Sequence, residues 1–194
     1  MFERHPAGPQ RSTYPVWSCV LARFHDELGQ PTKSRAAFDA LAADEFRGLP
    51  FDEDRLVSLS LLAEVAHSLG DAPRATDLYD GLSSYGDRVA VSYSVISMGS
   101  VSRYLGLLAS TLSRWDDAER HFRDALAMNE RIGARPWLAH TQDDYARLLL
   151  ALGRTGDAET ARGLLDQALA TYRDLGMEGY AASVSTLAAG TPST

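Results

Sequence analysis

A two-helix unit that recurs about every 40 residues limits what this chain can fold into. Each copy begins with an apolar helical segment that ends on a leucine, and these leucines are 41, 43 and 40 residues apart (Leu28, Leu69, Leu112 and Leu152). Glycine follows three of the four leucines, as is common where a helix ends. Single helix hairpins cannot bury their apolar faces, so the pattern predicts that the copies stack on one another.

A second helical segment in each copy has a small residue followed four positions later by a larger, mostly apolar one. The four pairs are Ser34 and Phe38, Ala75 and Tyr79, Ala118 and Phe122, and Ala161 and Leu165. Asp71 and Asp157 are predicted to cap the second helices that follow them. The sequence therefore predicts an all-α fold, a right-handed superhelical stack (α-solenoid) of about four helix hairpins, with a capping helix over residues 180–187.

The clearest copy is the segment 102–129, SRYLGLLASTLSRWDDAERHFRDALAMN. Apolar residues recur at three- and four-residue steps from Val101 to Leu112, which predicts one apolar stripe on a helix. Gly106 lies on the same side, where a second backbone is expected to approach closely. The second helix is predicted to begin near Arg114 and to end at Ile132-Gly133.

This hairpin resembles the tetratricopeptide repeat. The matching positions are the Leu105-Gly106 pair in the first helix and the Ala-x-x-x-Phe-x-x-Ala pattern over residues 118–125. The family's early Trp and closing Pro are absent, and Ala109 stands where the family has Tyr. The period of about 40 residues exceeds the family's usual ~34, which predicts longer helices or loops.

A wider resemblance covers residues 97–177. This region is similar to the C-terminal helical-repeat regions of large bacterial regulators: LuxR-type and MalT-like ATPase activators, and ATPases fused to nucleotide-cyclase domains. In those proteins the repeats act as sensor or coupling arms, so the resemblance implies a protein or peptide partner, with a small-molecule effector as an alternative. The chain has no GxxxxGK[ST] phosphate loop and no DNA-reading helix pair, so neither of those activities is implied.

The remaining segments carry weaker signals. Residues 1–13 are predicted to be a disordered lead-in or linker, 14–189 the helical-repeat domain, and 190–194 a frayed tail. An apolar stripe in the first helix is predicted to face inward (Trp17, Val20, Leu21, Phe24 and Leu28). Residues 89–97 alternate like a strand, but a lone strand has no partner, so we interpret them as a short helix or an extended lead-in.

Composition restricts the partners and the compartment. The formal net charge is −7 and Lys33 is the only lysine, which argues against direct nucleic-acid binding because phosphate backbones require clustered Lys and Arg. The single cysteine, Cys19, lies in an apolar helical pattern, so a buried structural thiol is expected. No run approaches the ~20 apolar residues of a membrane span, and a signal-peptide core is missing, so a cytoplasmic protein without membrane contact is expected.

No motif for catalysis or for cofactor binding is found in the sequence, and no cofactor is predicted. The nearest constellation is the segment AHTQDDYAR, with His140, Asp143, Asp144 and Arg147 on one helix. His140 and Asp144 are four residues apart and share a face, so a metal site is one interpretation, although it needs further ligands from elsewhere. We favour a solvated helix face with internal ion pairs, and no metal is predicted.

The first helix of each hairpin is predicted to line a binding groove with the residues that face away from the second helix. Arg103 and Tyr104 are the strongest candidates, since they combine a hydrogen-bond donor with an amphipathic ring near the middle of the array. The full set of predicted groove residues is Arg23, Glu64, His67, Arg103, Tyr104, Leu107, His140, Asp143, Asp144 and Arg147.

Three functions are compatible with this pattern. The first is a non-catalytic module that docks a protein partner or couples domains in a bacterial regulatory or signalling system. The second is a small-molecule or peptide sensor, in which a ligand in the groove changes the curvature of the stack. The third, which we favour least, is an enzyme that uses Asp143, Asp144 and His140 as acid–base groups on the groove wall. The sequence leaves homodimer formation open.

Overall fold

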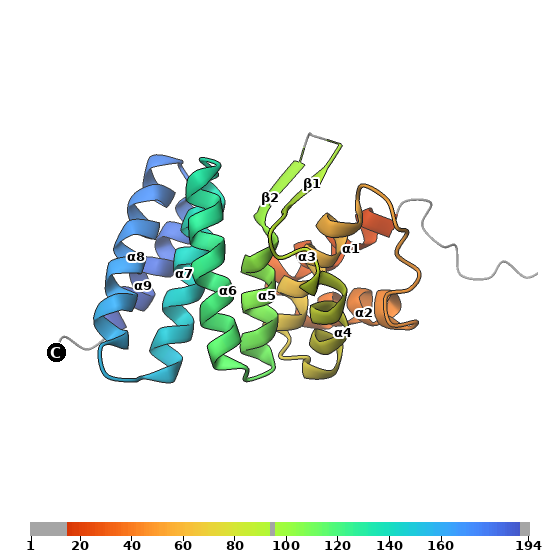
Figure 1. Cartoon of the computed structure of the whole chain (residues 1–194), viewed down its shortest axis with the longest axis horizontal. Coiled ribbons are helices and arrows are strands. Elements are labelled where there is room, and N and C mark those ends of the chain that lie inside the picture. Colours follow the sequence, from red (N-terminus) through yellow and green to blue (C-terminus); the bar gives the residue numbers. More distant parts are fainter. Residues whose placement is uncertain (1–14, 94–95, 191–194) are drawn as a thin grey trace, which may run out of the picture.

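The computed structural model describes residues 15–93 and 96–190 (Figure 1). Its elements are helices α1 (Pro15–Glu27), α2 (Pro31–Ala42), α3 (Arg55–Ser68), α4 (Ala72–Ser83), α5 (Val101–Thr111), α6 (Trp115–Arg131), α7 (Arg135–Leu152), α8 (Asp157–Asp174) and α9 (Glu178–Gly190), and strands β1 (Val89–Ser92) and β2 (Ile96–Ser100). The predictions for residues 1–13 and 191–194 lie outside the described residues.

The helices form hairpins that stand side by side along the long axis of the molecule, from α1 and α2 at one end to α8 and α9 at the other (Figure 1). Within the stack α1 packs on α3, α3 on α5, α6 on α7, and α9 on α8. The predicted stack of four helix hairpins followed by a final helix is therefore confirmed for the described residues, although a small two-stranded sheet makes the fold mostly α rather than all-α. None of the described helices is both long enough and apolar enough to cross a membrane.

The helix boundaries follow the predicted register. Leu69 and Leu112 are the C-cap residues of α3 and α5, and Gly153 ends α7 in the left-handed conformation. Asp71 caps α4 as predicted, because its carboxylate accepts the backbone N–H of Arg74 at 3.2 Å. The cap predicted at Asp157 is wrong by one residue: Gly156 is the N-cap of α8, and Asp157 is its first residue.

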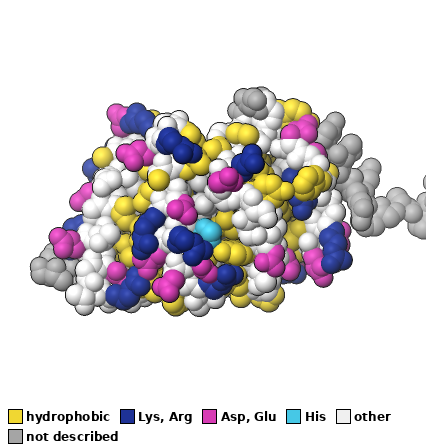
Figure 2. Space-filling view, in the orientation of Figure 1, with side chains coloured by type: hydrophobic (Ala, Val, Ile, Leu, Met, Phe, Trp, Pro, Cys, Tyr) yellow, Lys and Arg dark blue, Asp and Glu magenta, His cyan; other side chains and the backbone are white. Residues whose placement is uncertain are grey.

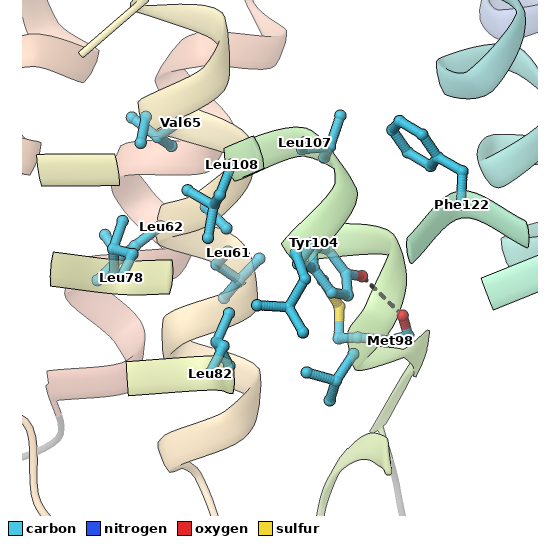
Figure 3. Packing of buried hydrophobic residues seen from close by; sticks show 14 of the residues in the cluster. Leu61, Leu62, Val65, Leu78, Leu82, Met98, Tyr104, Leu107, Leu108 and Phe122 are labelled. Atoms are coloured by element: carbon cyan, nitrogen blue, oxygen red, sulfur yellow. Dashed lines mark hydrogen bonds between the residues drawn. The ribbon is translucent and has the colours of Figure 1, made fainter. Parts of the chain in front are cut away.

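The core is continuous between neighbouring hairpins (Figure 3). Leu62 of α3, Leu78 of α4 and Leu108 of α5 are fully buried in it, and burial of each such side chain contributes about 1.5–3 kcal/mol. Gly106 has a different role from the predicted one. A Cβ at this position would lie 2.9 Å from the ring of Phe122, so the glycine accommodates a side chain of α6 rather than a second backbone.

The apolar stripe predicted to face inward from the first helix is wrong. Trp17 is 62% exposed and Phe24 is 55% exposed, and Val20, Leu21 and Leu28 are exposed as well. The buried residues of α1 are Ala22 and Cys19, the latter as predicted. Because α1 belongs to the first described hairpin, only α2 and α3 pack against it closely, and they cover the opposite side.

The interpretation of residues 89–97 as a helix or an extended lead-in is also wrong. These residues begin an antiparallel hairpin, in which Val91 pairs with Ser97 and Ser92 pairs with Ile96. The partner strand follows at once in the sequence, so the strand-like alternation was the correct signal. Figure 2 shows hydrophobic side chains near the hairpin and toward the α1–α2 end, with charges of both signs spread over this face.

Candidate functional site

Side chains from α1, α3, α5, α7, α9 and β2 line a cavity of about 300 Å³, which we call the central cavity. Its lining residues are Arg23, Glu27, Leu61, Glu64, Met98, Arg103, Trp137, His140, Asp143, Asp144 and Tyr180. Six of the ten predicted groove residues are among them: Arg23, Glu64, Arg103, His140, Asp143 and Asp144. The structure thus brings residues from four first helices to one place.

Five of the lining residues form a continuous ion network across α1, α3, α5 and α7. Arg23 Nε donates to Glu64 at 2.6 Å, and the same guanidinium also pairs with Glu27. Arg103 donates through Nη1 to Glu64 and through Nε to Asp144, both at 2.7 Å. The bonds between helices join residues 41, 39 and 41 positions apart, so the network follows the repeat period.

The network keeps its central groups ionised. Burial opposes ionisation of Glu64, but the nearby charges of Arg103 and Arg23 outweigh it and lower the pKa of Glu64 to about 2. Burial likewise disfavours the charged form of Arg103, yet the charges of Asp144 and Glu64 raise the pKa of its guanidinium. The Arg103 guanidinium also lies over the rings of Tyr104 and Trp137, 5.1 Å and 5.9 Å from their centroids.

Aromatic rings from α7 and α9 form another wall of the central cavity, and Tyr172 of α8 packs behind them. The ring of His140 lies 4.6 Å from that of Tyr180, 5.3 Å from Tyr172 and 5.4 Å from Trp137, measured between centroids. Its Nδ1 is 2.8 Å from the Tyr172 hydroxyl. Burial, assisted by the charge of Arg103, lowers the pKa of His140 to about 3. His140 is therefore neutral near pH 7 and packs as an uncharged aromatic ring.

Tyr180 lines the cavity and joins the first and last described helices. Its hydroxyl donates to Glu27 at 2.7 Å, a contact between residues 153 positions apart. Burial and this hydrogen bond raise the pKa of Tyr180 to about 12. The last described helix, α9, therefore contacts α1 through this hydrogen bond, in addition to covering α8.

Four predicted groove residues do not line the cavity. Tyr104 and Leu107 are buried, because α5 is enclosed by α3, α4 and α6; the Tyr104 hydroxyl donates to the carbonyl of Met98 at 2.6 Å (Figure 3). They are wrong as groove-surface positions. His67 is 2.9 Å from the Thr111 hydroxyl, and Arg147 pairs with Asp143 at 2.8 Å beside the cavity.

Five lining residues were not predicted from the sequence: Glu27, Leu61, Met98, Trp137 and Tyr180. Trp137 precedes His140 by one helical turn, and Glu27 follows Arg23 by another, so helical spacing was an available signal for both. The charge also alternates in sign from Arg23 to Glu64 to Arg103, residues that follow one another at the repeat period, and this alternation was a further signal. Nothing local indicates Tyr180, because its position depends on the curvature of the whole stack.

The acid–base candidates do not form one hydrogen-bonded set. The hydrogen bonds described for His140, Asp143 and Asp144 go to Tyr172, Arg147 and Arg103, respectively. Burial raises the pKa of Asp143, and the Arg147 charge opposes this shift. Among the described residues, no group of three His, Cys, Asp or Glu side chains is placed to hold a metal ion.

A stack of helix hairpins, with polar groups from successive first helices around one cavity, defines the class of helical-repeat proteins. Residues 97–174, which span β2 to α8, match the model of the tetratricopeptide repeat family. This segment includes the hairpin whose residues carry the resemblance to that family. Comparison with curated proteins finds no match to this chain.

We expect the fold to lose stability as the pH falls from about 6.5 towards about 3. His140 binds its proton in the unfolded chain near its ordinary pKa of 6.5, but in the folded chain only near pH 3, so the unfolded state takes up more protons in this window. One such group gives a slope of at most about 1.4 kcal/mol per pH unit. Burial lowers the pKa values of His67 and His121 too, so these residues add to the loss of stability. Burial raises the pKa of Asp143, so this residue opposes the loss as the pH falls.

Thermal unfolding of the wild type and of His140→Gln at several pH values measures this contribution. The variant should show a shallower fall of melting temperature between pH 6 and pH 4. Parallel curves for the two proteins would show that His140 does not contribute to the pH dependence.

Proposed function

We propose that this chain is a non-catalytic interaction module that holds a segment of a protein partner against the central cavity. The observation that supports this function most directly is the convergence of residues from four successive first helices on one half-open site. Glu64 and Arg103 at its base are nearly buried, while Glu27 at its edge is 41% exposed and accessible to a partner. Tetratricopeptide repeats generally mediate protein–protein interactions, which supports the same conclusion.

The proposed biological setting is a bacterial regulatory or signalling system in the cytoplasm. This part of the proposal rests on the resemblance of residues 97–177 to the repeat arms of LuxR-type and MalT-like regulators and of cyclase-fused ATPases. In that setting the chain couples binding of a partner to the activity of another domain or protein.

A second candidate function is a sensor that takes a small molecule or a short peptide. Two observations favour it: the central cavity is near the lower limit of ordinary ligand sites in volume, and Tyr180 bridges to Glu27 across it. A ligand that separates these two residues would change the distance between the ends of the stack. Thermal-shift measurements detect this case, since a ligand that binds the native state raises the melting temperature.

Selection of displayed peptides tests the interaction function and does not require the partner to be identified first. The full chain is used to enrich peptides from a random twelve-residue library, and the affinity of the selected peptides is then measured for two variants. Glu27→Gln with Asp144→Asn alters the central cavity. Asp124→Asn with Glu130→Gln removes the same charge from exposed positions of α6, which does not line the cavity.

We expect the cavity variant to bind the selected peptides at least about tenfold more weakly than the wild type, which corresponds to about 1.4 kcal/mol. The α6 variant should bind them with unchanged affinity. Circular dichroism and melting temperatures confirm that both variants are folded. The proposal is wrong if no peptide is enriched, or if the two variants bind every selected peptide equally well.

A further inference from the structure

The charges that line the central cavity are not balanced. Four carboxylates (Glu27, Glu64, Asp143 and Asp144) face two guanidinium groups (Arg23 and Arg103), and the remaining ionisable rings are uncharged near neutral pH. Arg147, which pairs with Asp143 beside the cavity, compensates only one of the surplus charges. A guest that carries a positive charge is therefore favoured over a neutral or negative one.

The two arginines of the cavity are already engaged, so they are poor receptors for an acidic guest. Arg23 contacts Glu64, Glu27 and Asp26 through its three guanidinium nitrogens. Arg103 contacts Glu64 and Asp144 through two of its nitrogens, and its guanidinium lies against aromatic rings. An incoming carboxylate would have to replace a carboxylate that the fold already supplies.

The rings of the cavity favour the same type of guest. Trp137 and Tyr180 line the cavity next to its carboxylates, and the faces of such rings attract ammonium and guanidinium groups. Arg103 demonstrates this chemistry within the structure, because the fold stabilises its guanidinium between two carboxylates and over two rings. A cavity of about 300 Å³ has room for one long side chain but not for a folded segment.

We propose that the central cavity binds the cationic side chain of an arginine or lysine in an extended segment of the partner protein. The inference rests on the proposed interaction function and specifies the chemistry of what is bound. The guest cation lies between the carboxylates of α1 and α7 and against Trp137 and Tyr180. The rest of the partner segment follows the concave surface.

Titration of the full chain with N-acetyl-arginine methylamide tests this inference directly. The probe is followed by the nuclear magnetic resonance signal of the Trp137 indole N–H, which is assigned among the three tryptophans by single Trp→Phe substitutions. The citrulline analogue has nearly the same shape without the charge, and the glutamate analogue has the opposite charge. We expect saturation by the arginine probe with a Kd on the order of 1 mM, and at least tenfold weaker binding of both analogues.

Substitutions assign this binding to the cavity. Asp144→Asn should lower the affinity for the arginine probe at least about threefold. Asp124→Asn, an equal change of charge on α6, should leave this affinity unchanged. Equal binding of the arginine and citrulline probes would overturn the inference. So would preferred binding of the glutamate probe, or a Trp137 signal that none of the three probes shifts.

The selection of displayed peptides separates failure of this inference from failure of the proposed function. Peptides that depend on the cavity residues but contain no arginine or lysine would leave the interaction function intact and overturn the inference. If no peptide depends on the cavity residues, the interaction function fails and the inference fails with it.

Discussion

Replacement of Arg103 by leucine is expected to lower the free energy of unfolding by about 3–5 kcal/mol. The Arg103 side chain is 6% exposed and is the shared partner of Glu64 and Asp144, whose side chains are 10% and 18% exposed. Without the guanidinium, both carboxylates lose a hydrogen-bonded counter-charge in a region that water reaches poorly. Arg23 still pairs with Glu64, so Asp144 is affected more strongly. Chemical denaturation of the wild type and the variant measures the loss.

Arg154 provides a matched control for this prediction. It also pairs with two carboxylates, those of Glu119 and Asp157, but its side chain is 47% exposed. Since exposed ion pairs contribute about 0–1 kcal/mol to stability, Arg154→Leu should lower the free energy of unfolding by no more than about 1 kcal/mol. Adding Glu64→Gln and Asp144→Asn to Arg103→Leu should recover part of the stability, because no unpaired charge is then left buried. Equal losses for Arg103→Leu and Arg154→Leu would contradict the prediction.

Gly99→Ala is expected to destabilise the fold by about 2–5 kcal/mol, the sum of a backbone cost and a packing cost. Gly99 has φ +69°, a conformation that L residues other than glycine adopt at a cost of about 1–2 kcal/mol. A Cβ there would lie 2.6 Å from Cβ of Trp137 and 2.9 Å from Oδ1 of Asn129. Neither atom moves easily, since Asn129 Oδ1 accepts the N–H of Ser100 at 2.9 Å and Trp137 Cβ lies close to the α7 backbone.

Gly133→Ala separates the two costs. Gly133 has nearly the same backbone angle, φ +67°, but no atom lies within 4 Å of the position a Cβ would occupy. Gly133→Ala should lower the free energy of unfolding by about 1–2 kcal/mol. The additional loss in Gly99→Ala is then the packing cost of the close approach between β2 and α7. A Gly99→Ala variant no less stable than Gly133→Ala would show that the hairpin can move away from Trp137 without penalty.

The stack was predictable from the sequence because each hairpin is a local unit whose register appears in its own residues. Leu69 and Leu112 marked the ends of α3 and α5 correctly, although nothing in those segments describes the neighbouring hairpins. The stripe around Trp17 failed for a related reason. Periodicity shows which residues share a helix face, but the neighbouring elements decide which face is buried, and among the described elements α1 has close neighbours on one side.

The site was only partly predictable, because it depends on how the hairpins are arranged in space. The rule that first helices line the groove identified Arg23, Glu64 and Arg103, which belong to three successive hairpins. It failed for Tyr104, since α5 lies in the middle of the stack and has almost no free face. Tyr180 lies beside Glu27, 153 positions earlier, only in the assembled stack, and no single segment of the sequence contains this arrangement.

The hydrogen bond from Tyr180 to Glu27 changes how cooperativity operates in this molecule. In an open solenoid each unit depends only on its immediate neighbours, so the two termini fray independently. Here one hydrogen bond also joins α9 to α1, the last and the first of the described helices, so each of these two helices depends on the other through a contact worth at most about 1 kcal/mol. Local unfolding of α9 is therefore transmitted to α1 directly, without passing through the hairpins that lie between them.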